Sequence, residues 1–139
     1  MGEKMTETEL PLFALYTKSP YGHPDFIPLC LDEIRLHSEK NKDYTSGDAS
    51  APLGNFYRVS AFLLDWGIDI PPYLVAFIYM MKQLDAVGNM LGENYKGEIE
   101  GIEERLRDVS VYAKLIQILY EEAQDGQKNL SNSGCLPKV

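Results

Sequence analysis

The most constraining feature of this sequence is a long helical repeat in its C-terminal third. Apolar side chains recur there at alternating steps of three and four residues, which places them on one face of an α-helix. They are Ile99, Ile102, Leu106, Val109, Ala113, Ile116 and Tyr120. A continuous apolar seam of this length predicts a helix that packs this face against a core.

Three further helices are expected before this one. They cover about residues 25–41, 52–66 and 72–92, and the polar stretch 42–54 between the first two is rich in Gly, Ser, Thr and Asp, as loops are. The helix from Pro72 carries an apolar stripe made of Leu74, Phe77, Ile78, Met81 and Leu84. Helices joined by such connections predict an all-α fold, an antiparallel bundle of four to five helices.

Both ends of the chain lack a sustained period. Residues 1–24 contain three prolines and two glycines, and the sequence after Gly126 is polar and aperiodic. We therefore expect an irregular N-terminal segment over residues 1–24, one bundle domain over 25–124, and a disordered tail over 125–139.

The composition narrows the classes of partner. The formal net charge of −8 argues against binding along a nucleic-acid backbone, which requires clustered Lys and Arg, although the charge can also serve solubility alone. The sequence has no apolar run of about 18 residues and no secretory signal at its start. Cys30 and Cys135 do not suggest a disulfide framework. We expect a cytoplasmic protein that acts on a free small molecule, not on a membrane or a nucleic acid.

Three carboxylates beside the C-terminal seam are the strongest local signal for chemistry. Glu100, Glu104 and Asp108 are spaced by four residues, so they stack on one helix face and repel one another. Mg²⁺ takes carboxylate oxygens as ligands, would relieve this repulsion, and could hold a phosphate through its remaining positions. The alternative is a solvated face that Arg105 and Arg107 balance.

Two other groups of polar residues could contact a ligand. Lys82 shares a helix face with Tyr79 and Asp85, where its ammonium could meet a carboxylate or a phosphate, or reach water along its stem. A second group of polar residues lies on both sides of the 42–54 loop and could bind a base and its phosphates. Alternatively, these residues belong to an ordinary polar loop. The group comprises Lys40, Lys42, Asp43, Tyr44 and Asn55. Glu33 and His37, four residues apart, are more often a structural pair than a catalytic one.

These segments, taken in order, resemble a known family. The run Lys40-Asn41-x-Asp43-Tyr44 after a first helix, Asn55-Phe56, Lys82, and EGIEERLRDVSVY from Glu100 to Tyr112 resemble the nucleotide-modification-associated domains and their phage relatives. Those are similar to the all-α NTP pyrophosphatase superfamily, which includes the MazG proteins and the dimeric dUTPases. The resemblance covers about residues 30 to 118.

The resemblance implies a MazG-like bundle that forms a homo-oligomer, a dimer or a tetramer, in a phage or a bacterium. It implies a Mg²⁺-dependent hydrolase that converts a nucleoside triphosphate to a monophosphate and pyrophosphate. Position by position, Glu104 and Asp108 match the family's catalytic acids, and Tyr44, Asn55 and Lys82 match its substrate-binding positions. We add Lys42 and Tyr112 as substrate-binding candidates, and expect Mg²⁺ ligands among Glu33, Asp85, Glu104 and Asp108.

This sequence departs from the acidic motifs of the family. MazG-type enzymes carry E-x-x-E on one helix and E-x-x-D on the next, whereas here Arg105 stands three residues before Asp108 and no E-x-x-E occurs on a partner helix. Two alternatives therefore stay open: a protein that binds a nucleotide without hydrolysing it, and a helical oligomer that acts as a protein-interaction module.

Overall fold

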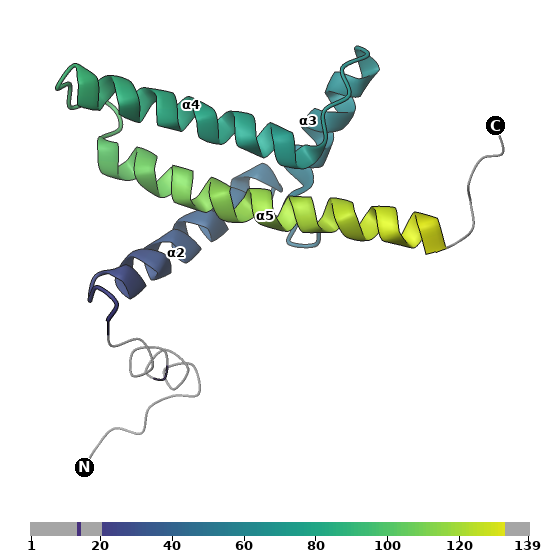
Figure 1. Cartoon of the computed structure of the whole chain (residues 1–139), viewed down its shortest axis with the longest axis horizontal. Helices are drawn as coiled ribbons and strands as arrows, with labels where there is room; N and C mark the ends of the chain where they lie inside the picture. The colour runs from purple at the N-terminus through teal and green to yellow at the C-terminus, as the bar shows by residue number, and fades with distance from the viewer. Residues whose placement is uncertain (1–13, 15–20, 133–139) are drawn as a thin grey trace. The chain divides into compact units, whose positions relative to one another are not determined.

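A computed structural model describes residue 14 and residues 21–132 of the chain. The described part contains four α-helices and no strand (Figure 1): α2 (Phe26–Tyr44), α3 (Gly54–Asp65), α4 (Pro72–Gly92) and α5 (Ile102–Asn132). The expectation of an all-α fold is confirmed, with four helices where four to five were predicted. No helix among these residues combines the length and the apolar character that a membrane span requires.

The chain divides into two compact units, Met1–Ile34 and Arg35–Val139. The described part of the first unit consists mainly of the start of α2, where the amide of Phe26 donates to the carbonyl of His23 at 3.1 Å. Most of the predicted irregular segment, residues 1–13 and 15–20, lies outside the described residues.

In the second unit, α4 and α5 lie side by side and run in opposite directions, and α3 packs against α4 (Figure 1). Pro72 stands in the first turn of α4, where its missing N–H leaves no hydrogen bond unmade. The turn between α4 and α5 requires a glycine at Gly97, because its φ is +75° and a Cβ there would collide with the Glu100 carbonyl oxygen.

The core of the second unit is small and lies where α3, α4 and α5 meet. Its buried side chains are Leu53, Phe56, Val75, Ala76, Leu115 and Leu119. Partly buried side chains extend it, among them Val59, Tyr73, Tyr79, Val111 and Tyr112. This core orients the inner faces of α4 and α5 toward each other.

The predicted core faces of α4 and α5 are wrong in detail. The apolar stripe of α4 (Leu74, Phe77, Ile78, Met81 and Leu84) is 40% to 52% exposed. The buried side of this helix instead carries Val75, Ala76, Val87 and Met90. On α5, Leu106 and Tyr120 of the predicted seam are about half exposed, and Ile99 precedes the helix and is exposed. The core instead receives Leu115 and Leu119.

Two helices are longer than the sequence predicts. α2 continues through Lys42 to Tyr44, so the connection to α3 is shorter than the expected 42–54 loop. α5 continues past Gly126 to Asn132, so the prediction of a disordered tail is wrong for residues 125–132, and residues 133–139 of that tail lie outside the described part. Helical geometry thus tolerates Gly126, whose cost in a helix interior is only about 1 kcal/mol.

Candidate functional site

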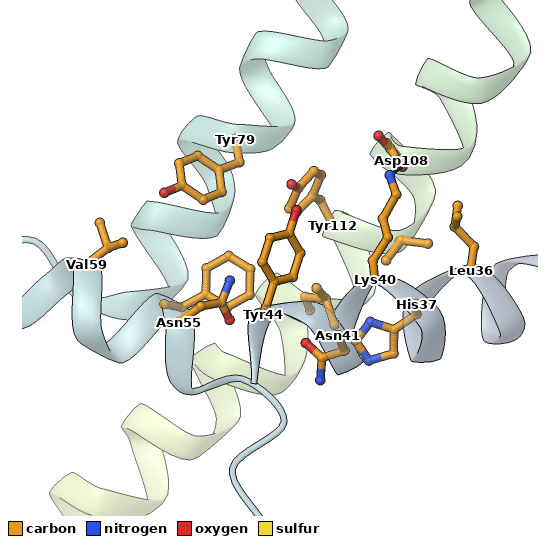
Figure 2. Close-up of a pocket in the computed structure, with 13 residues that line it drawn as sticks. Leu36, His37, Lys40, Asn41, Tyr44, Asn55, Val59, Tyr79, Asp108 and Tyr112 are labelled. Atoms are coloured by element: carbon orange, nitrogen blue, oxygen red, sulfur yellow. Dashed lines mark hydrogen bonds and ion pairs between the residues drawn. The ribbon is translucent and has the colours of Figure 1, made fainter. Parts of the chain in front are cut away.

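A pocket of about 270 Å³ opens in the second unit, between the last turns of α2 and the helices α3, α4 and α5 (Figure 2). Its walls are formed by Leu36, His37, Lys40, Asn41, Tyr44, Asn55, Phe56, Val59, Tyr79, Asp108, Val111, Tyr112 and Leu115. Its polar side chains come from helices that are far apart in the sequence. Such a combination of apolar walls and a few converging polar groups is the usual form of a small-molecule site.

Aromatic rings form the inner end of this pocket. The rings of Phe56 and Tyr79 lie 6.0 Å apart, and those of Tyr79 and Tyr112 lie 6.2 Å apart at 71°. Figure 2 shows the ring of Tyr44 standing at the end of α2 in front of Tyr112. Tilted and edge-to-face contacts at these distances are favourable and hold the rings in place. The pocket therefore offers a planar ligand a preformed aromatic wall.

The hydroxyl of Tyr112 stays protonated. Burial raises the pKa of Tyr112 to about 12, and the neighbouring Tyr44, Asp108 and Tyr79 act in the same direction. A protonated phenol can donate as well as accept a hydrogen bond. At neutral pH, Tyr112 is thus a neutral donor in the pocket wall.

A polar network lies at the other end of the pocket. Lys40 Nζ donates to Asp108 Oδ1 at 2.7 Å, and Gln83 Nε2 donates to Asp108 Oδ2 at 3.1 Å. Gln83 Oε1 in turn accepts from Arg105 Nη1 at 2.8 Å. Asp108 is buried, with 8% of its surface exposed, and both of its oxygens are occupied. A buried carboxylate paired in this way is satisfied without a metal ion.

Asn55 differs from this satisfied network. Its Oδ1 is buried and has no hydrogen-bond partner, and it is one of two such side-chain atoms in the described part of the chain, the other being Arg105 Nε. Asn55 stands on the first turn of α3 and lines the pocket. An unpaired buried acceptor costs about 1–3 kcal/mol. A ligand donor that reached this oxygen would recover that cost.

Of the site residues that the resemblance implies, four line this one pocket: Tyr44, Asn55, Asp108 and Tyr112. Lys40, a candidate from the loop group, lines it as well. The other predicted residues lie elsewhere. Lys42 lines a separate hollow beside the 45–52 connection. Lys82 and Asp85 are exposed on α4, where Asp85 accepts from Asn89 Nδ2 at 3.5 Å. Glu33 belongs to the first unit.

The three predicted carboxylates, Glu104 and Asp108 on α5 and Glu100 just before it, reach one small cavity of about 150 Å³, together with Lys40 and Arg107. Each already has a partner. Glu104 Oε2 accepts from the Gly101 amide at 3.0 Å, which caps the start of α5, and Glu100 lies 3.6 Å from Arg105 Nη1. Within the described residues, no group of three or more His, Cys, Asp or Glu side chains could hold a metal ion. In this arrangement the carboxylates do not fit Mg²⁺.

Sequence reasoning missed Gln83 and did not assign Lys40 to Asp108. Gln83 lies four residues after Tyr79 and four before Val87, on the inner face of α4. A single amide within an apolar helix face is a signal of a buried hydrogen bond. The pairing of Lys40 with Asp108 spans 68 residues, so no local sequence pattern predicts it.

Comparison of the chain with protein-family models, with curated proteins and with solved structures finds no significant match. The fold and the pocket thus define a class only: an all-helical protein with a tyrosine-lined pocket beside a buried carboxylate. The resemblance to the all-α NTP pyrophosphatase superfamily stays a prediction.

Proposed function

We propose that this chain binds a nucleotide, with the base held in the tyrosine-lined pocket. The observation that carries the proposal is the unpaired Asn55 Oδ1 beside an aromatic wall. Nucleobases have flat faces that stack on aromatic side chains, and their edges carry N–H donors that an amide oxygen accepts. Asp108, the carboxylate in the wall, already has both oxygens engaged.

The size of the pocket limits which part of the ligand it holds. Ligand pockets span about 300–1,000 Å³, and the pocket here, at about 270 Å³, falls just below that range. It accommodates a base and part of a sugar, with the phosphates at its mouth. There the Lys40 side chain is 44% exposed and can meet a phosphate oxygen with its ammonium.

Binding without hydrolysis accounts for the site better than hydrolysis does. For Mg²⁺-dependent pyrophosphohydrolysis, Asp108 and Glu104 would have to give up Lys40, Gln83 and the Gly101 amide. Hydrolysis is the second candidate, because the three predicted carboxylates do line one cavity beside the pocket. Pyrophosphate released from a nucleoside triphosphate with Mg²⁺, and lost in EDTA and in Asp108→Ala, would establish hydrolysis.

The binding proposal is tested by titrating the purified chain with nucleosides and with mono-, di- and triphosphates, with and without Mg²⁺. We expect at least one nucleotide to raise the melting temperature and to give a saturable calorimetric signal without product. Asn55→Leu should abolish this binding while leaving the melting temperature of the free chain unchanged or higher, because it removes an unpaired buried oxygen. Unchanged affinity in this variant, or no binding across the panel, contradicts the proposal.

A matched pair of tyrosines tests the aromatic wall. Tyr44 and Tyr95 are 53% and 51% exposed, but only Tyr44 lines the pocket. Loss of one aromatic stacking partner costs about 1–3 kcal/mol, so Tyr44→Ala should weaken nucleotide binding by about 5- to 150-fold. Tyr95→Ala should leave the affinity unchanged. Equal losses in the two variants would show that the effect is not local to the pocket.

A further inference from the structure

The outer face of α4 is apolar and uncovered by the other described elements of the second unit. Six large side chains lie on it, each 40% to 67% exposed: Leu74, Phe77, Ile78, Met81, Leu84 and Leu91. Gly88 lies within the same face, and a Cβ added there would meet no atom within 4 Å. The opposite side of the helix packs against the core. A helix that is apolar all round is normally buried on all sides.

The area of this face approaches that of a protein–protein interface. With about 200 Å² for a fully exposed large side chain, the six half-exposed residues present about 600 Å². The largest apolar patch of an ordinary monomer is about 300–600 Å², and a standard interface buries about 800 Å² per partner. Leu106 and Tyr120 of α5 are also about half exposed, and Tyr120 contacts Tyr73 of α4 at 5.4 Å. Through this contact Tyr120 adds apolar surface beside α4.

We propose that two copies of this chain associate through the outer faces of α4, antiparallel and related by a twofold axis. A twofold interface places one surface against itself, so the face must be self-complementary. With the axis between Lys82 and Gln83, Met81 faces the partner's Leu84, and Phe77 faces the partner's Gly88. In the outermost layer, Leu74 faces the partner's Leu91. The Phe77 ring thus meets a position that has no side chain.

Charge selects the antiparallel orientation. The only charged residues between Pro72 and Gly92 are Lys82 and Asp85, and both lie on the same flank of the apolar face. Antiparallel helices bring equal flanks together, whereas parallel helices bring opposite flanks together. Around the proposed axis, Lys82 of each copy lies beside the partner's Asp85, which gives two equivalent ion pairs. A parallel pair would leave both charges beside apolar side chains.

The variant Gly88→Leu should disrupt the proposed interface without destabilising the single chain. In the single chain the new side chain meets open space, and leucine favours a helix more than glycine does. In the proposed dimer it collides with the partner's Phe77. Gly126→Leu is the matched control, because Gly126 also lies within a helix with no atom near its Cβ position, but on α5.

Sedimentation velocity on the full chain over micromolar concentrations tests the proposal. We expect wild type and Gly126→Leu to have twice the 15.7 kDa mass of one chain. Gly88→Leu should weaken association at least a hundredfold, yet melt no lower than wild type at concentrations where both are monomers. A monomeric wild-type chain, or a Gly88→Leu chain that still dimerises, overturns the proposal.

Charge exchange tests the register. Lys82→Asp alone sets two acids against each other across the axis, and we expect about tenfold weaker association from the two altered pairs. The double variant Lys82→Asp with Asp85→Lys restores opposite charges and should recover wild-type association. Recovery of dimers in the double variant supports the antiparallel axis. No recovery overturns this register.

Discussion

The two faces of α4 are built from similar side chains but have opposite surroundings. The inner face carries Val75 and Ala76, which are 2% and 0% exposed, whereas Ile78 and Met81 on the outer face are about half exposed. Both faces are apolar enough to drive burial. The described residues cover only one of them, so α4 has more apolar surface than this part of the chain buries.

The polar residues of α4 mark the same division. Gln83, on the inner face, joins Asp108 and Arg105 in the network beside the pocket. Lys82 and Asp85, at the edge of the outer face, are exposed. The inner face therefore builds the candidate ligand site, and the outer face provides the candidate contact between copies.

Introducing a charge on each face gives the largest expected contrast. Val75→Asp places an unpaired carboxylate in the core and should cost at least about 4 kcal/mol, a large share of the stability of a small domain. Ile78→Asp should change the unfolding free energy of the monomer by less than about 1 kcal/mol. Urea denaturation followed by circular dichroism, at concentrations where the chain is monomeric, measures both. Equal losses would mean that the outer face is buried within a single chain.

Removing the amide from the inner face should have an intermediate effect. Gln83→Leu leaves Asp108 with Lys40 alone and deprives Arg105 of its acceptor at 2.8 Å. The expected cost is about 1–3 kcal/mol, because buried polar groups lose their partners. Gln117→Leu is the control: Gln117 is exposed and donates only to Glu121, so its loss should stay within about 0.5 kcal/mol. Similar values for both variants would show that the network contributes nothing to stability.

Sequence periodicity predicts where most of the helices lie, but it does not predict which face of each helix is buried. The expected helices over 52–66 and 72–92 agree with α3 and α4 to within two residues at each end, because Gly67 and Pro72 are strong local signals. The apolar stripe from Leu74 to Leu84 on α4 can also be identified from the sequence. Periodicity cannot tell a face that packs within the chain from one that packs against another molecule, since both are apolar.

The candidate site could be predicted only in part, for a similar reason. The spacing correctly places Glu104 and Asp108 on one face of α5, whereas Glu100 precedes the helix; all three carboxylates nevertheless reach one cavity. Whether such acids bind metal depends on their partners. Asp108 is held by Lys40, 68 residues away, and by Gln83, 25 residues away. Contacts of this range depend on how helices pack, which local spacing does not encode.

A change of pH should give the smallest effect, and it should distinguish the two faces. Of the two histidines in the sequence, only His37 lines the pocket, and neither lies on the outer face of α4. Burial lowers the pKa of His37 below its ordinary value of 6.5. Between this lowered pKa and 6.5 the unfolded chain binds more protons than the folded chain, so stability is lost as the pH falls below 6.5. Because His37 is only partly buried, the loss should be small.

Melting temperatures measured between pH 7.5 and pH 5, chosen to bracket the ordinary histidine pKa of about 6.5, check this prediction. We expect a modest fall for wild type and a smaller one for His37→Gln, which removes the titrating group. Dimer association by sedimentation should stay constant in both chains over the upper part of this range, because the proposed interface contains no histidine. A dimer that dissociates in step with protonation of His37 would mean that the pocket and the outer face of α4 are coupled, and the separation of the two faces would then be wrong.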